Sequence, residues 1–198
     1  MSRLIETICL KDGEFLNLNY HEQRAQRALV VLFGSSKKPA LEEYLKNTEF
    51  PKEGFYKCRV TYTDQFRKVE FIAYERRIIN SLKMIVDDAI SYEHKFEDRH
   101  ELNALFSRRG TSDDILILKQ GLITDTSHAN IVFRENDRWV TPKSYLLSGT
   151  MRQSLLDRKI ITENEIRAAD LPRFTKFKLI NAMVGFDGPE IDVSAIVE

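Results

Sequence analysis

The stretch Tyr92-Glu93-His94-Lys95-Phe96-Glu97-Asp98-Arg99-His100-Glu101-Leu102-Asn103 decides how the rest of the chain is interpreted. An apolar run from Met84 to Val86 precedes it, and apolar residues at helical spacing follow it. Lys95 is therefore predicted to lie where a strand gives way to a helix, a frequent location of reactive groups in α/β proteins. A single lysine is most often a solvated surface residue, so this prediction needs support from the rest of the sequence.

Motifs downstream of this stretch provide that support. In chain order, the lysine and the motif residues are Lys95, Asp125, Asn130, Thr141-Pro142 and Gly149 to Arg152. This order resembles the class IV aminotransferases, the fold-type IV pyridoxal-phosphate enzymes, in which a lysine is followed by an acid five residues before an asparagine, a Thr-Pro hairpin and a Gly-x-x-Arg turn. The resemblance extends from about residue 5 to residue 184, which is nearly the whole chain.

The length alone is compatible with one domain or with two small ones. The resemblance implies an α/β (α+β) protein with the two-domain D-amino acid aminotransferase-like fold. A small N-terminal α/β domain is expected at residues 1–80, and a larger domain that binds pyridoxal phosphate at residues 81–198. The family normally has a further strand and turn before the position of Glu6-Thr7, so the N-terminal part is expected to be shortened.

Composition places the chain among ordinary globular proteins. Hydrophobic residues make up 42% and charged residues 30% of its 198 residues, and 30 Lys and Arg balance 30 Asp and Glu. This balance gives no electrostatic sign of a nucleic-acid or membrane partner. The N-terminus lacks a signal-peptide pattern, and no run approaches ~18 apolar residues, so a cytoplasmic location is expected. Cys9 and Cys58 are expected to be reduced, and the histidines lack the spacing of a metal site.

The N-terminal part of the sequence predicts paired strands, one long helix and a short helix near Leu41 to Leu45. Residues 4–10 and 15–18 are expected to form a hairpin. Asn19 is predicted to cap a helix that ends at Gly34. In a second pair of strands, at 54–62 and 68–74, Lys57 and Arg59 would share one face because side chains alternate along a strand.

The remaining sequence predicts short strands with two helices. The predicted elements are strands at 82–86, 115–119, 123–124, 131–133 and 178–183, and helices at 101–109 and from 147–150 onward. Arg99, four residues after Lys95, is expected on the same side of a helix as Lys95. Residues 162–165 resemble a capping box, although the segment favours neither helix nor strand.

The resemblance implies a site for pyridoxal phosphate, which requires an amine, an acid facing its ring nitrogen, phosphate donors and an apolar slot. Lys95 is implied as the covalent amine and as the base that moves the substrate proton, and Asp125 as the acid. A guanidinium and a helix N-terminus both suit a phosphate. The residues implied to contact the cofactor are Lys95, Asp125, Arg24, Arg99, Gly149, Thr150, Met151, Asn181 and Ala182. Lys57 and Arg59 are candidates for the substrate carboxylate.

Short matches favour one reaction within the family. The turn from Gly149 to Gln153, the Lys95-x-x-x-Arg99 spacing and Asn181-Ala182-Met183 look more like 4-amino-4-deoxychorismate lyases than like branched-chain or D-amino acid aminotransferases. Thr7 matches a threonine in the first strand of the lyases and is a candidate catalytic residue. Such a lyase forms 4-aminobenzoate and pyruvate for folate biosynthesis. One departure is Asp125, where the family has a glutamate, so the carboxylate is set back by about one methylene.

The sequence leaves two alternative functions open, and the resemblance also implies an oligomeric state. The first alternative is an aminotransferase for branched-chain or D-amino acids, and the second is a non-catalytic relative, against which the presence of Lys95 argues. The substrate is expected to be a small-molecule amine, with no metal, nucleic acid or membrane involved. The family is dimeric, so a homodimer is expected.

Overall fold

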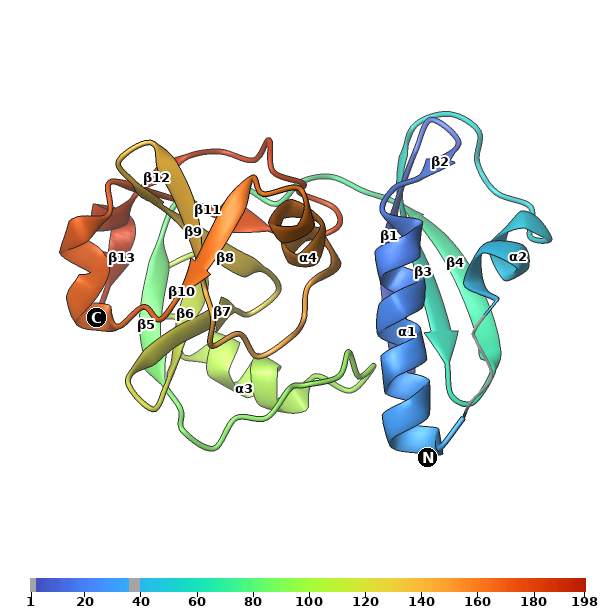
Figure 1. Ribbon diagram of the computed structural model, residues 1–198, viewed down its shortest axis with the longest axis horizontal. Coiled ribbons are helices and arrows are strands. Elements are labelled where there is room, and N and C mark those ends of the chain that lie inside the picture. Colours follow the sequence, from blue (N-terminus) through green and yellow to red (C-terminus); the bar gives the residue numbers. More distant parts are fainter. Residues whose placement is uncertain (1–2, 36–39) are drawn as a thin grey trace. The chain divides into compact units, whose positions relative to one another are not determined.

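The computed structural model describes residues 3–35 and 40–198 and divides the chain into two compact units (Figure 1). Unit 1 contains Met1–Arg76 and His94–Asp98, and unit 2 contains Arg77–Glu93 and Arg99–Glu198. The first break therefore follows Arg76, whereas the sequence-based boundary lay near residue 81. The chain returns to unit 1 for five residues, and Lys95 is one of them.

Unit 1 is built on a four-stranded antiparallel sheet in the order β2-β1-β3-β4. Its strands are β1 (Leu4–Lys11), β2 (Glu14–Phe15), β3 (Phe55–Tyr62) and β4 (Phe66–Ala73). Asp12 and Gly13 join β1 to β2 with φ values of 48° and 83°, the left-handed conformation that a tight hairpin turn requires. Leu4 pairs with Tyr62, so the even-numbered residues of β1 and β3 share one face of the sheet.

Two helices cover that face with apolar side chains. Helix α1 (Leu18–Phe33) contributes Ala25, Ala28 and Leu29 to a buried cluster with Leu4 and Tyr62. Helix α2 (Leu41–Lys46) packs its leucines against the other end of β1.

Local backbone conformation sets both ends of α1. Gly34 ends the helix at a φ of 62°, as predicted, because glycine adopts this conformation without steric cost. The predicted cap at Asn19 was wrong. Asn17, at a φ of 54°, immediately precedes the helix, so Asn19 lies in the first turn.

Residues 94–98 form a short extended segment beside β1. The N–H of Ile5 donates to the carbonyl of Lys95 at 2.9 Å, and the N–H of Glu97 donates to the carbonyl of Arg3 at 2.9 Å. Arg99 is only the cap of the next helix. The prediction that Lys95 and Arg99 lie on one side of a helix was therefore wrong, because pairing with β1 keeps Lys95 extended.

Unit 2 contains a larger mixed sheet. Its main path runs β10-β9-β8-β7-β6-β5-β13, and β11 pairs with β8 and β12. The strands are β5 (Leu82–Val86), β6 (Asp114–Lys119), β7 (Leu122–Thr126), β8 (Asn130–Glu135), β9 (Arg138–Pro142), β10 (Ile161–Asn164), β11 (Lys176–Ile180), β12 (Ile191–Asp192) and β13 (Ile196–Val197). Strands β6 to β9 are successive antiparallel neighbours, whereas β5 and β10 pair in parallel with β6 and β9.

Short helices accompany this sheet. They are α3 (His100–Ser107), α4 (Thr150–Asp157) and the 3-10 helices η1 (Ala168–Arg173) and η2 (Val193–Ala195). Met151 and Leu155 of α4 pack in a buried cluster with Val132, Ile161 and Ile180 from three strands. The capping box suggested at 162–165 was wrong, because parallel pairing with β9 holds this segment as β10. Among residues 3–35 and 40–198, no helix combines the length and apolar character that crossing a membrane requires.

Candidate functional site

Lys95 lies within unit 1 close to a buried polar cluster of α1. Its side chain is partly buried. Burial of the His21 imidazole is the main cause that lowers the pKa of His21, and the positive charge of Lys95 adds to this effect. Such an effect requires the two groups to be near each other. The Lys95 amine, which is predicted to bind the cofactor, therefore lies near the cluster that contains His21 and Arg24.

A buried carboxylate organises that cluster. Glu6 is fully buried on β1, and Nδ1 of His21 lies 2.6 Å from its Oε2. Nε of Arg24 donates to Oε1 at 3.0 Å, and Nη2 of Arg24 contacts Oε2. Burial raises the pKa of Glu6, but the charges and hydrogen bonds of Arg24 and His21 outweigh burial, so the pKa falls to about 2. Glu6 is therefore ionised at neutral pH and holds Arg24 in one orientation.

The other predicted residues of unit 1 lie on the opposite face of its sheet. Thr7 pairs directly with Arg59 across β1 and β3, and Lys57 is the next residue of β3 on the same face. Nη2 of Arg59 donates to Oε1 of Glu97 at 2.9 Å. The structure thus brings Thr7 and Arg59 together and places Arg24 on the side of the sheet that α1 covers.

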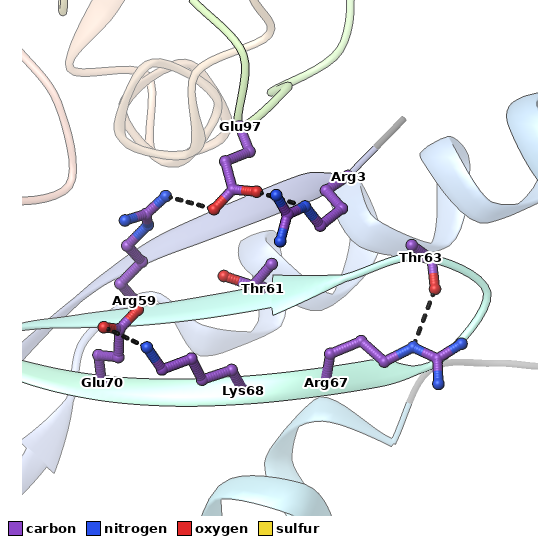
Figure 2. A pocket seen from close by; sticks show the side chains of 8 residues that line it. All are labelled: Arg3, Arg59, Thr61, Thr63, Arg67, Lys68, Glu70 and Glu97. Atoms are coloured by element: carbon purple, nitrogen blue, oxygen red, sulfur yellow. Dashed lines mark hydrogen bonds and ion pairs between the residues drawn. The ribbon is translucent and has the colours of Figure 1, made fainter. Parts of the chain in front are cut away.

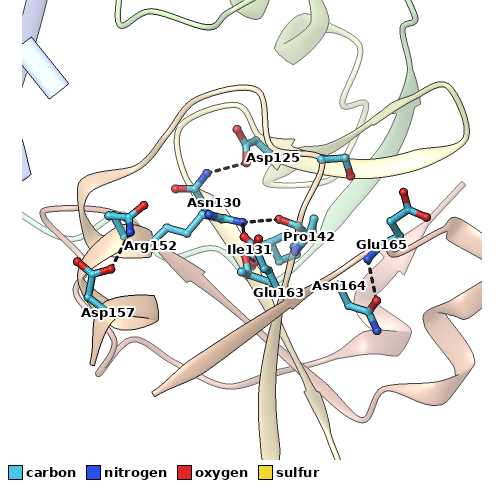
Figure 3. A network of polar contacts seen from close by, with 12 residues as sticks. Asp125, Asn130, Ile131, Pro142, Arg152, Asp157, Glu163, Asn164 and Glu165 are labelled. Atoms are coloured by element: carbon cyan, nitrogen blue, oxygen red, sulfur yellow. Dashed lines mark hydrogen bonds and ion pairs between the residues drawn. The ribbon is translucent and has the colours of Figure 1, made fainter. Parts of the chain in front are cut away.

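Asp125 lies at the centre of the predicted site in unit 2. Its Oδ2 accepts the N–H groups of Leu146 and Leu147, both at 2.9 Å, and its Oδ1 accepts Nδ2 of Asn130 at 2.7 Å (Figure 3). Burial raises the pKa of Asp125 to about 6, and these neutral donors offset burial only in part. Asp125 is thus a buried acid that titrates slightly below neutral pH.

Three side chains hold the turn between Asp125 and Asn130. Nη2 of Arg99 donates to the carbonyl of Ser127. Nδ2 of Asn181 donates to the carbonyl of His128 at 3.3 Å. Nδ1 of His128 lies 2.7 Å from Oδ2 of the buried Asp114. Arg99 and Asn181, which the sequence placed at the cofactor, therefore meet at one turn of unit 2.

The start of α4 packs against the same turn. A Cβ atom at Gly149 would lie 1.8 Å from Oδ1 of Asn130, so only glycine fits while Asn130 donates to Asp125. Thr150 and Met151 are buried in the first turn of α4. Ala182 lies in the turn after β11, next to Asn181.

Arg152 makes buried contacts that the Gly-x-x-Arg motif did not predict. It is buried, and its Nη2 donates to the carbonyl of Pro142 at 2.9 Å and to Oε2 of Glu163 at 2.7 Å (Figure 3). Its guanidinium lies 4.4 Å from the centre of the Tyr145 ring. Arg152 therefore ties α4 to the ends of β9 and β10.

Sequence reasoning missed Glu6, Asp114 and His128. Glu6 carried a usable signal, because it falls on the apolar face of an alternating strand, between Leu4 and Ile8. A carboxylate in that position needs buried cationic partners. No comparable pattern marked Asp114 or His128, which come together only through the pairing of β6 with β7.

Comparison with known proteins identifies the family. The profile described as amino-transferase class IV matches residues 98–186. A Haemophilus influenzae protein of uncharacterised function is 35% identical over 187 residues, which cover 93% of this chain and all of that protein. A crystal structure from Haemophilus somnus, of a protein provisionally named a 4-amino-4-deoxychorismate lyase, is 34% identical with a TM-score of 0.85 over 94% of this chain and 98% of that one. The chain belongs to the class IV aminotransferase family.

A more distant class IV structure shows the same fold. It is a hypothetical aminotransferase from Mycobacterium tuberculosis in a form with bound pyridoxal phosphate, and it is 16% identical with a TM-score of 0.79 over 98% of this chain and 81% of that one. The predicted fold class, a mixed α and β protein of fold type IV, is confirmed, as is the family. The roles of the individual site residues stay predictions.

Proposed function

We propose that this class IV protein is a pyridoxal-phosphate-dependent lyase that converts 4-amino-4-deoxychorismate into 4-aminobenzoate and pyruvate. The observation that carries the proposal is the full-length similarity to the Haemophilus somnus protein with that provisional name. The chain also keeps an amine at Lys95 and a buried acid at Asp125. An aminotransferase for branched-chain or D-amino acids is the second candidate, since the matching family profile is that of the class IV aminotransferases.

The donor set of the chain fits the cofactor. Unit 1 offers Lys95 and, close to it, a fixed guanidinium at Arg24. Unit 2 offers Asp125 and the first turn of α4, where Gly149 has no side chain to occupy the helix start. An amine, an acid, a phosphate-binding cation and a helix N-terminus are the groups that pyridoxal phosphate needs.

Each of these residues would have a defined task. Pyridoxal phosphate, when bound, supplies an electron-withdrawing ring next to the substrate nitrogen. Nζ of Lys95 would accept the proton from the carbon beside that nitrogen. Asp125, ionised above about pH 6, would keep a proton on the ring nitrogen. Arg24 and the amides of Thr150 and Met151 would bind the phosphate.

A product assay tests the proposal. Purified protein supplied with pyridoxal phosphate and 4-amino-4-deoxychorismate should release 4-aminobenzoate and pyruvate in equal amounts. Lys95→Ala should abolish both, and Lys11→Ala, an exposed lysine on β1, should change neither. Amino-group transfer from amino acids to 2-oxoglutarate without 4-aminobenzoate would establish the second candidate instead.

A spectroscopic measurement tests the non-catalytic alternative. The wild-type protein should be yellow, with an absorbance that borohydride removes and that Lys95→Ala lacks. A colourless protein that takes up no added pyridoxal phosphate would refute both enzyme proposals. The homodimer and the cytoplasmic location stay predictions, and sedimentation of the purified protein checks the first.

A further inference from the structure

A cavity of about 520 Å³ lies within unit 1 over the odd-numbered face of its sheet, opposite α1 (Figure 2). Arg59 and Thr61 of β3 form its floor together with Lys68 and Glu70 of β4. Glu97, from the extended segment that carries Lys95, closes one side. Its volume falls within the range of small-molecule sites, about 300–1,000 Å³.

Cationic side chains dominate the wall of this cavity. The lining contains four cations and two carboxylates, namely Arg3, Arg59, Arg67, Lys68, Glu70 and Glu97. The cations come from two strands, β3 and β4, and from the residue before β1, and Figure 2 shows them around one hollow. A concave surface with an excess of positive charge attracts anions.

The positive charge is least balanced around Glu97. Its carboxylate accepts Nε of Arg3 at 2.7 Å and Nη2 of Arg59 at 2.9 Å, so two guanidinium groups share a single carboxylate. The buried Nε of Arg59 has no hydrogen-bond partner among the described residues. A guanidinium with an unused N–H can donate to a second carboxylate once a side-chain movement uncovers that N–H.

The other two cations are held by weaker partners. Lys68 pairs with Glu70 at 2.8 Å, and Arg67 pairs with Asp64 at 3.0 Å. More than half of each cationic side chain is exposed, and exposed ion pairs contribute little free energy. A ligand carboxylate can therefore replace either partner at small cost.

We propose that this cavity binds a small organic dianion, with one carboxylate at Arg3 and Arg59 and the other at Lys68 and Arg67. The inference rests on the proposed function, because 4-amino-4-deoxychorismate carries two separate carboxylates. Lys57, the other basic residue predicted for the substrate, does not line the cavity.

Calorimetric titration of the full-length protein with chorismate tests the proposal. Chorismate carries both carboxylates and has a hydroxyl where the substrate has an amine, so it binds without reaction and without cofactor. We expect saturable binding to the wild type. Lys68→Gln and Arg59→Gln should each weaken it by about ten-fold, the usual effect of losing one charge-assisted contact. Lys11→Gln, at an exposed lysine on the same face but outside the cavity, is the matched control and should change the affinity less than two-fold.

Substitution of the acidic residue Glu97 should change the affinity for chorismate in the opposite direction. Glu97→Gln removes the carboxylate that competes for Arg3 and Arg59, so chorismate should bind more tightly. Benzoate, which has one carboxylate, should bind about ten-fold more weakly than chorismate. Lys68 is exposed, so Lys68→Gln keeps the test decisive even if Arg59→Gln does not fold.

Two results would overturn the inference. One is the absence of saturable chorismate binding, and the other is an equal effect of Lys68→Gln and Lys11→Gln. Failure of the proposed function would give a different pattern of results in the binding and product assays. Wild type that binds chorismate but forms no 4-aminobenzoate contradicts the lyase alone, and a working lyase with unchanged binding in Lys68→Gln and Arg59→Gln contradicts the cavity alone.

Discussion

Glu6 in unit 1 and Asp125 in unit 2 are both buried carboxylates, and their acidities are shifted in opposite directions. The pKa of Glu6 falls to about 2, whereas that of Asp125 rises to about 6. Burial is the largest cause for both and raises both. Arg24 and His21 reverse this effect at Glu6, while Asp125 receives two backbone N–H groups and the amide of Asn130. The charge of the donors therefore decides the outcome, since both carboxylates accept several hydrogen bonds.

This difference separates a structural acid from one that can take part in chemistry. With a pKa of about 2, Glu6 stays ionised around neutral pH, so it can orient Arg24 but does not exchange protons there. Asp125 changes charge close to neutral pH. Perturbed groups of this second kind are common at functional sites.

Loss of the Glu6 charge should have the largest effect on stability. Glu6→Gln leaves Arg24 buried without its counter-charge, and breaking a buried ion pair in this way costs about 3–5 kcal/mol. Urea denaturation at pH 7 measures the change in the free energy of unfolding. Glu14→Gln, an exposed glutamate on β2, is the control and should stay within about 0.5 kcal/mol of the wild type. A loss below about 1 kcal/mol for Glu6→Gln would mean that Arg24 finds another partner.

The second prediction concerns pH and Asp125. The folded pKa of about 6 lies above the ordinary aspartate value of 3.8, so the folded state binds the proton more tightly than the unfolded state. The resulting stability is fully present below about pH 4 and is lost as the pH rises through about 6. At 1.36 kcal/mol per pKa unit, the loss amounts to about 3 kcal/mol. The free energy of unfolding of wild type relative to Asp125→Asn should fall by that amount between pH 4 and 7.

The control for this slope is an exposed aspartate. Asp137→Asn, on the fully exposed β8–β9 turn, should leave the pH dependence between pH 4 and 7 as in the wild type. Glu6 cannot produce the slope, because its lowered pKa stabilises the folded state above about pH 4.5 and loses that contribution only as the pH falls through about 2. A flat difference between wild type and Asp125→Asn would show that the neutral donors stabilise the ionised carboxylate as well as cations do.

Part of the difference between the surroundings of Glu6 and Asp125 could be predicted from the sequence, and part could not. Asp125 and Asn130 were predicted from the family resemblance, and the structure pairs them directly across the β7–β8 hairpin, which is a local relationship. The partners of Glu6 lie 15 and 18 residues away on α1 and depend on how that helix packs on β1. The extended conformation of Lys95 was missed for the same reason, since β1 lies some ninety residues earlier in the chain. The capping box predicted at 162–165 does not form, because this segment pairs with the distant strand β9.

A glycine substitution tests whether Asn130 matters to Asp125. In Gly149→Ala the new methyl would meet Oδ1 of Asn130, which must then move away from Asp125. Overpacking of this kind costs about 1–3 kcal/mol. Combining Gly149→Ala with Asn130→Ala should restore part of the loss, because the smaller side chain leaves room. Equal losses in the single and double variants, measured by urea denaturation, would show that the strain lies in the backbone of α4 instead.

The smallest expected effect comes from a neutral donor to Glu6. The hydroxyl of Tyr62 hydrogen-bonds this carboxylate, and Tyr62→Phe should cost about 1 kcal/mol, since Arg24 and His21 still satisfy the charge. Tyr44→Phe is the matched control, because Tyr44 and Tyr62 both pack on the ring of Phe66. It should change the free energy of unfolding by less than half as much. A cost for Tyr62→Phe comparable to that of Glu6→Gln would mean that neutral donors hold this carboxylate as strongly as the cations do, and the charge of the donors would then not explain the opposite pKa shifts of Glu6 and Asp125.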